Sequence, residues 1–154
     1  MFQAKEAVRL VLNGVVVGEN WEPAKTMDFP GIWDFLKEYQ PKAKEAGVDP
    51  LGYFLPPYAY AQMQILSEAI TKVGSLDQGK IADYIHHTAF KTIVGDIKFA
   101  ANGEWEKERI LFVQYQGVVG NDVNQFRQVG RQVIVFPPQF KSGDFKYPYS
   151  DFKK

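Results

Sequence analysis

The segment GYFLPPYAYAQMQIL, residues 52–66, carries the densest structural information in this chain. A Pro-Pro step leads into a long apolar run, and proline is tolerated in the first turn of a helix because the backbone N–H there has no intrahelical partner. The apolar spacing predicts a helix from about Tyr58 to Val73, ended by Gly74. Aromatic rings crowd the start of this helix, where they can either fill a core or line a pocket.

Further helices are predicted on both sides of this segment. Residues 3–12 have apolar positions at helical spacing and precede an Asn-Gly stop signal. Residues 29–46 present one apolar face, and Pro41 is expected to kink or end that helix. A shorter helix follows residue 74, with Ser75 or Asp77 as its expected cap. The helix at 58–73 carries the widest apolar surface, so we expect it to pack on a sheet.

Strands are predicted before and after the helical region. A β-branched run between glycines, residues 15–17, suggests a buried strand, and residues 19–23 are predicted to form a loop at its C-terminal end. After Phe90 the pattern changes to period two, which predicts strands within residues 92–99, 110–116 and 132–136. The tail from Gln139 onward is expected at the surface. Helices and strands together predict an α/β chain in which helices pack on a sheet.

Composition narrows the classes of function. The chain has 154 residues, which is most consistent with one domain or a piece of a larger one. Lys plus Arg and Asp plus Glu both number 18, so no basic excess suggests nucleic acid as a partner. There is no cysteine, and no apolar run approaches the ~20 residues that span a membrane. The N-terminal residues do not read as a signal peptide, because charges interrupt the apolar run.

An ordered series of motifs resembles a known family. The helix YAYAQMQIL at 58–66 is followed by GSLD at 74–77, KIADYI at 80–85, FKTIVGDIKF at 90–99 and Gly103-Glu104. This order is similar to the C-terminal part of periplasmic solute-binding proteins of ABC transporters, of the branched-chain amino acid (Leu/Ile/Val) binding type. The resemblance runs from about Leu12 to Tyr149 and is most specific from Gly52 to Glu104.

The resemblance implies a fold, a location and a role. The fold would be the C-terminal part of a type I periplasmic binding fold, with helices on a mostly parallel sheet. The chain, 1–154, would be a single fragment-like domain. Residues of about 22–109 would match one lobe, and about 1–20 and 117–154 would match hinge and second-lobe pieces. The protein would lie in the periplasm, or in the cytoplasm if the chain as written is the whole gene product.

The same resemblance supplies candidate ligand-binding residues. Phe54, Leu55 and Tyr58 lie where the family often places apolar contacts to the ligand's side chain, and Trp21 lies at the end of a hinge strand. Ordinary packing is the alternative for Phe54 and Tyr58, and core or hinge packing is the alternative for Trp21. The family's N-terminal portion, which supplies the loops that hold a ligand's carboxylate and ammonium, has no counterpart in this sequence.

The residues do not suggest an enzyme, a metal site or a cofactor. His86 and His87 are adjacent in a predicted helix, so they diverge and are read as solvent-facing or capping residues. The acids show no paired arrangement suited to acid–base catalysis.

Two functions remain. The first is a non-catalytic receptor or receptor fragment that binds an amino acid or another aliphatic or aromatic carboxylate and engages a transporter permease. The second is a truncated remnant that only self-associates or binds a partner. Open sheet edges or apolar surface left by the missing portion predict a homo-oligomer.

Overall fold

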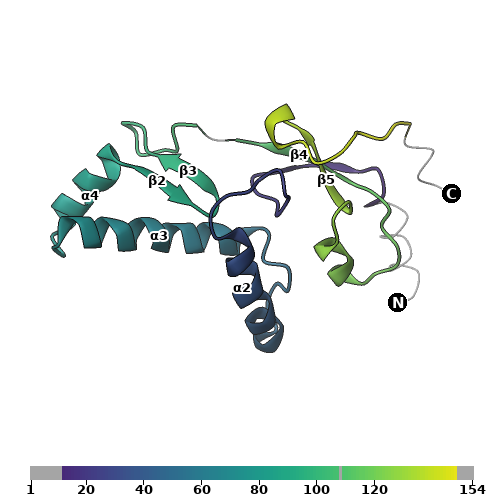
Figure 1. The fold of residues 1–154 in the computed structure, drawn as a ribbon, viewed down its shortest axis with the longest axis horizontal. Coiled ribbons are helices and arrows are strands. Elements are labelled where there is room, and N and C mark those ends of the chain that lie inside the picture. Colours follow the sequence, from purple (N-terminus) through teal and green to yellow (C-terminus); the bar gives the residue numbers. More distant parts are fainter. Residues whose placement is uncertain (1–11, 108, 149–154) are drawn as a thin grey trace.

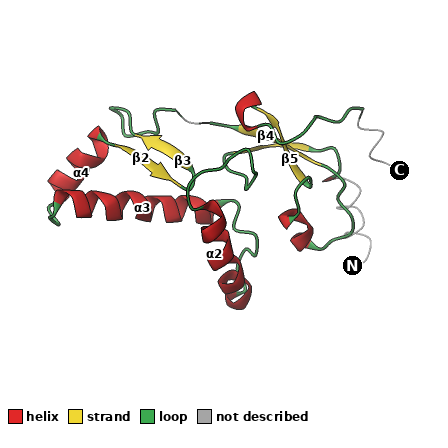
Figure 2. Cartoon of the chain, in the orientation of Figure 1, coloured by secondary structure: helices red, strands yellow, loops and turns green. Residues whose placement is uncertain are grey.

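The computed structural model describes residues 12–107 and 109–148 of the chain (Figure 1). Its elements gather in two regions along the long axis. Three helices and a two-stranded hairpin occupy one region, and a small sheet occupies the other (Figure 2). The mixed helix and strand content confirms the predicted α/β class. The helix predicted at 3–12 lies outside the described residues except for its last position.

The three helices are α2 (Ile32–Ala46), α3 (Leu55–Val73) and α4 (Gln78–His87). Pro41 does not end α2, which continues for five more residues. The cap of α4 is Asp77, whose Oδ1 accepts a hydrogen bond of 3.0 Å from the backbone N–H of Lys80. This bond satisfies one of the N–H groups that a helix start leaves without an intrahelical partner.

The long helix α3 begins three residues before the predicted position and ends as predicted. Gly74 adopts a left-handed conformation with φ of 63° and donates its N–H to the carbonyl of Ile70. One stripe of α3 is buried, at spacings of four residues. A second apolar stripe of α3 faces outward, since Met63 is 62% exposed and Leu66 is 39% exposed. The buried stripe consists of Pro57, Ala61, Ile65 and Ala69.

The described strands form two antiparallel sheets. A hairpin pairs β2 (Ala89–Thr92) with β3 (Gly95–Lys98). A three-stranded sheet has the order β1-β4-β5, from β1 (Val16–Glu19), β4 (Leu111–Tyr115) and β5 (Gln132–Phe136). Short 3-10 turns, η1 (Val123–Arg127) and η2 (Pro138–Phe140), flank β5.

The prediction of a mostly parallel sheet is therefore wrong for the described residues. Parallel neighbours need a crossover connection, usually a helix between two strands. Here α2, α3 and α4 follow one another with no strand between them. The turn between β2 and β3 is only Ile93-Val94, which allows only an antiparallel pair.

A single core joins the two regions. Trp21, Met27, Ile93, Leu111 and Ile134 are each no more than 1% exposed and belong to one hydrophobic cluster. The cluster draws on the loop that follows β1, on the hairpin turn and on strands β4 and β5. It therefore fixes the position of the loop that follows β1 relative to the rest of the chain.

Arg109 reinforces this junction from the surface side. Its guanidinium carbon lies 5.0 Å from the ring centre of Phe29, 5.2 Å from that of Trp105 and 5.6 Å from that of Phe140. Its Nη2 donates to the carbonyl of Val94 in the hairpin turn. A cation placed among aromatic faces is attracted by their electron-rich rings, so Arg109 links the hairpin to the loops around β1 and β5.

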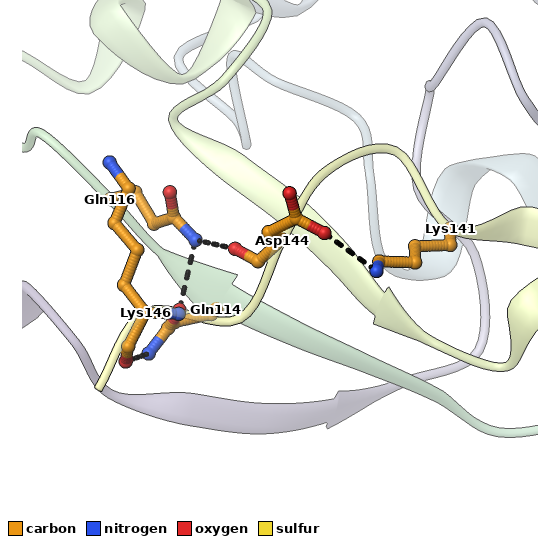
Figure 3. Close-up of polar contacts among 5 residues, drawn as sticks. All are labelled: Gln114, Gln116, Lys141, Asp144 and Lys146. Carbon is orange, nitrogen blue, oxygen red and sulfur yellow. Dashed lines mark hydrogen bonds and ion pairs between the residues drawn. The ribbon is translucent and has the colours of Figure 1, made fainter. Parts of the chain in front are cut away.

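Two buried glutamines, one in β4 and one directly after it, hold the C-terminal segment (Figure 3). Gln114 accepts a hydrogen bond of 2.9 Å from the N–H of Lys146 and donates one of 3.1 Å to its carbonyl. Gln116 donates to the carbonyl of Asp144 at 2.8 Å and to Gln114 Oε1 at 2.9 Å. The tail side chains are mostly exposed, as predicted, but the tail backbone is bound to the sheet.

Candidate functional site

A cavity lined by a buried charged residue lies between the two regions of the fold. It has a volume of about 210 Å³. We call it the Glu22 cavity. Its lining comes from the loop after β1, from α2, from the segment before α3 and from the C-terminal third of the chain. The lining residues are 22–26, Trp33, Tyr53, 126–130, Gln132 and Ser142.

Hydrogen bonds between distant parts of the sequence close the walls of this cavity. Gln132 Nε2 donates to Glu22 Oε2 at 3.2 Å across 110 positions of sequence. Arg127 Nη2 donates at 2.8 Å to the carbonyl of Pro50, just before α3. Thr26 Oγ1 donates at 2.6 Å to the carbonyl of Phe140 in η2. The cavity is therefore held open by the fold and does not depend on a single loop.

Glu22 is the chemically distinctive group of the cavity. The residue is only 4% exposed, and the bond from Gln132 is the only hydrogen bond that its carboxylate accepts from the described residues. No Lys, Arg or His side chain in the described part of the chain lies within 4.0 Å of it. Burial raises the pKa of Glu22 well above its usual value of 4.5, and the nearby Glu19 carboxylate raises it further.

The remaining walls combine rings with polar and basic groups. Trp33 is 48% exposed and Phe126 is half-buried, so both offer ring surface at the cavity. Burial, with a smaller effect of Glu22, raises the pKa of Tyr53 to about 12, which keeps its phenol neutral. Lys25 and Arg127 are exposed and place positive charge at the edge of the cavity. A small molecule with both charges and an apolar part meets complementary groups here.

A second concavity is an open groove between α2 and α3, which we call the α3 groove. Its volume is about 520 Å³. All of its lining side chains are apolar or aromatic, and no charged residue lines it. Such a surface suits an apolar partner better than a small polar solute. It is lined by Phe35, Tyr39, Leu55, Pro56, Ala59, Tyr60 and Met63.

The structure does not bring the four predicted site residues together. Trp21 is buried behind the wall of the Glu22 cavity, with its ring 6.2 Å from that of Tyr53. Leu55 lines the α3 groove, and Phe54 is 63% exposed and lines neither concavity. Tyr58 is half-buried and packs against the core. Contact between these side chains and a solute stays a prediction.

Sequence reasoning missed Glu22 and Gln132, the polar pair of the cavity. Glu22 was expected in an ordinary loop, where a carboxylate is solvated. One signal was present, because Glu22 directly follows a large aromatic residue, Trp21. The strand before it, β1, was predicted to be buried, but its positions alternate between exposed and half-buried, and Val16 is 39% exposed. No local signal marks Gln132, since its partner is 110 positions away.

The histidines are placed as expected. His86 and His87 are exposed in the last turn of α4, and His87 Nδ1 lies 2.8 Å from the carbonyl oxygen of Asp83. No cluster of three or more His, Cys, Asp or Glu suited to a metal ion occurs within residues 12–107 and 109–148. In the same residues, no helix has the length and apolar content required to cross a membrane.

Comparison with solved structures gives a fold relationship. The chain is similar to the crystal structure of a leucine-binding protein, LivK, from Thermotoga maritima MSB8, with 24% sequence identity and a TM-score of 0.54. The match covers 70% of this chain and 29% of that protein, so the chain spans less than a third of its length. No protein-family model matches the chain, and no curated protein matches it. The chain therefore shares the fold of part of a leucine-binding protein.

Proposed function

We propose that this chain is a non-catalytic solute-binding domain, or part of one, that serves uptake of amino acids or related small carboxylates by an ABC transporter. The fold likeness to a leucine-binding protein supports the solute-binding part of this proposal. Transport, contact with a permease and a periplasmic location are further parts of the proposal that rest on the family resemblance alone. So does the division into one lobe at about 22–109 with hinge and second-lobe pieces on either side.

The single observation that carries the proposal is the Glu22 cavity. Its volume of about 210 Å³ is below the roughly 300–1,000 Å³ of typical ligand pockets, so it suits a molecule of amino-acid size. Its lining combines a buried carboxylate, two exposed basic side chains and aromatic rings. This set of groups matches an ammonium, a carboxylate and an apolar side chain.

The residues suggested by the resemblance have different parts in this proposal. Trp21 supports the cavity through its ring contact with Tyr53. Phe54, Leu55 and Tyr58 are proposed to contact an apolar part of the solute where it extends beyond the cavity. This extension is the weaker part of the proposal, because Leu55 lies on the α3 groove and not on the cavity.

Thermal melting with a library of amino acids and small carboxylates tests the proposal. A ligand at 100 times its Kd adds about 2.7 kcal/mol to the free energy of unfolding, which raises Tm by roughly 5–10 °C for a chain of this size. Trp33→Ala, on the cavity wall, is expected to reduce that rise. Leu76→Ala is the matched control, since Leu76 is 78% exposed and lines neither concavity. If no compound in the library shifts Tm, the solute-binding proposal fails.

A second candidate function is self-association without ligand binding. The specific observation in its favour is the outward apolar stripe of α3 beside the α3 groove. Exposed apolar surface of this kind favours pairing with another copy of the chain. Light scattering separates the two functions, because this candidate requires an oligomer whose melting is unaffected by any solute.

A further inference from the structure

Two neighbouring hydrogen-bond acceptors in the Glu22 cavity lack donors. Glu22 Oε2 accepts from Gln132, but Glu22 Oε1 accepts no hydrogen bond from the described residues. Gln132 Oε1 is buried and likewise accepts none. Both side chains line the cavity. A buried acceptor such as Gln132 Oε1 is costly to leave without a donor, and a group that supplies N–H or O–H donors lowers that cost.

The charges around Glu22 favour a cationic donor over a neutral one. Glu19, the charged residue that acts on the pKa of Glu22, carries the same negative charge. Tyr53 is neutral. The two basic residues of the lining, Lys25 and Arg127, are exposed, and neither forms an ion pair with Glu22. A buried carboxylate without a cation is unfavourable when ionised, so a positively charged ligand group gains more here than a hydroxyl does.

A primary ammonium group fits these requirements best. It has three N–H donors and a compact positive charge. One donor can serve Glu22 Oε1, and another is available for Gln132 Oε1. The rings of Trp33 and Phe126 line the same cavity, and aromatic rings suit a cation and its apolar chain.

We infer that the solute of the Glu22 cavity carries a primary ammonium group, which forms an ion pair with the Glu22 carboxylate. The inference rests on the proposed solute-binding function and adds the class of ligand and the anchoring residue. At a pH where the free Glu22 carboxyl is protonated, its proton passes to solvent as the carboxylate–ammonium pair forms; at a pH where it is already ionised, the pair forms without proton release.

The sign of the pH dependence follows from this balance. In the free protein, burial and Glu19 raise the pKa of Glu22, so the carboxyl holds its proton to higher pH than usual. A bound ammonium favours the ionised carboxylate and lowers that pKa again. Affinity for amines therefore rises as pH increases from the usual carboxyl range to the raised pKa of the free protein, and then levels off.

Three matched compounds test the inference by thermal melting and calorimetry on the full chain. They are L-leucine, 3-methylbutylamine, which lacks the carboxylate of leucine, and 4-methylpentanoate, which lacks its ammonium group. We expect L-leucine and the amine to raise Tm and 4-methylpentanoate to leave it unchanged. Calorimetry near pH 4.5, where the raised pKa keeps the free Glu22 carboxyl protonated, in two buffers of different ionisation enthalpy should report release of protons from wild type on binding the amine.

Two variants assign the effect to Glu22. Glu22→Gln keeps the side-chain shape and should weaken binding of the amine by about tenfold to a hundredfold, because a hydrogen bond to a charged group is lost. It should also abolish proton release. Glu45→Gln is the control, since Glu45 is exposed on α2 and does not line the cavity, and it should change affinity by less than about twofold. Melts without ligand show whether each variant is folded.

The outcomes separate this inference from the proposed function. If 4-methylpentanoate, or any library compound without an ammonium group, binds as tightly as its amine counterpart, the inference is overturned while solute binding stands. Unchanged amine affinity in folded Glu22→Gln also overturns it. If no amine, amino acid or carboxylate shifts Tm, the inference and the proposed function fall together.

Discussion

The indole Nε1 of Trp21 donates a hydrogen bond of 2.9 Å to the carbonyl of Ile93, which lies 72 positions later in the chain. Trp21 is 1% exposed and Ile93 is fully buried. The bond joins the loop that follows β1 to the turn of the β2–β3 hairpin. Because Glu22 comes directly after Trp21, the same bond helps to fix the backbone from which the Glu22 carboxylate enters its cavity.

Trp21→Phe tests the contribution of this bond to stability. The change removes the only side-chain hydrogen bond to the Ile93 carbonyl among the described residues and leaves a buried acceptor without it, which costs about 1–3 kcal/mol in the free energy of unfolding. Urea titration of the two proteins measures the difference. Trp33→Phe is the control, since Trp33 is 48% exposed and its replacement should cost no more than about 0.5 kcal/mol. Equal losses for the two variants would show that the bond has no special role.

The hairpin that receives this bond shows what the sequence could and could not predict. Period-two apolar spacing identified strands around residues 92–99, but Ile93-Val94 was expected within a strand. These residues form the turn instead, and both are fully buried. Turns are usually exposed and polar. Here the turn is covered by Trp21 and by Gln64 of α3, whose Oε1 accepts from the Ile93 N–H, and no local pattern predicts that cover.

The candidate site was less predictable than the helices and strands. The helix ends at Gly74 and Asp77 were predicted because capping signals lie within a few residues of the helix end. Strands β4 and β5 were predicted because the alternation of apolar residues is visible within each strand. The Glu22 cavity depends on contacts across 77 to 114 positions of sequence, which composition and spacing do not encode. The parallel sheet was expected from the family resemblance, and the described strands pair in a different way.

The raised pKa of Glu22 predicts a pH-dependent loss of stability. The folded state keeps the Glu22 proton to higher pH than the unfolded chain does. The stability that this difference in proton binding adds is therefore fully present at and below the usual pKa of 4.5. It is lost as pH rises through the raised pKa of the folded state. Glu22→Gln removes the titration, so the variant should be at least about 0.5 kcal/mol more stable relative to wild type at pH 8 than at pH 4.5.

Urea titrations of both proteins at several pH values measure this difference. Glu45→Gln is the control, because Glu45 is exposed on α2 and its removal should leave the pH profile parallel to that of wild type. Parallel profiles for wild type and Glu22→Gln would contradict the argument that Glu22 is buried without a compensating cation.

The outward stripe of α3 predicts self-association. Leu55 is 67% exposed, Met63 is 62% exposed and Leu66 is 39% exposed, and two of the three border or line the α3 groove. Burial of this surface against another copy removes apolar area from water. Sedimentation velocity over a range of concentrations should show an oligomer, and Met63→Lys should weaken it by about tenfold, because the lysine charge would be buried in the contact.

Leu76→Lys is the matched control for this prediction. Leu76 is more exposed than Met63, at 78%, but it lies in the connection between α3 and α4, away from the groove. It should leave the association unchanged. A wild-type chain that stays monomeric at every concentration, or equal effects of the two lysines, would exclude the α3 stripe as the contact surface.

Two glycines with the same backbone conformation should differ in their tolerance of a side chain. Gly52 has φ of 72° and Gly74 has φ of 63°, a region that costs any other residue about 1–2 kcal/mol. A Cβ on Gly52 would lie 2.5 Å from two carbon atoms of the Tyr39 ring, whereas a Cβ on Gly74 meets nothing within 4 Å. Gly52→Ala should therefore lower the free energy of unfolding by about 1–3 kcal/mol more than Gly74→Ala does.

The Tyr39 ring cannot move aside without losing contacts of its own, so a clash with a side chain at position 52 should lower the free energy of unfolding. The ring stacks on Phe35, with centres 5.5 Å apart, and its hydroxyl donates at 3.0 Å to the carbonyl of Asp49. A double-mutant cycle with Tyr39→Ala isolates the clash, since Gly52→Ala in that background should cost no more than Gly74→Ala. If Gly52→Ala lowers the free energy of unfolding equally with and without the Tyr39 ring, backbone strain alone accounts for the need for glycine at position 52. The contact with Tyr39 would then have no part in it.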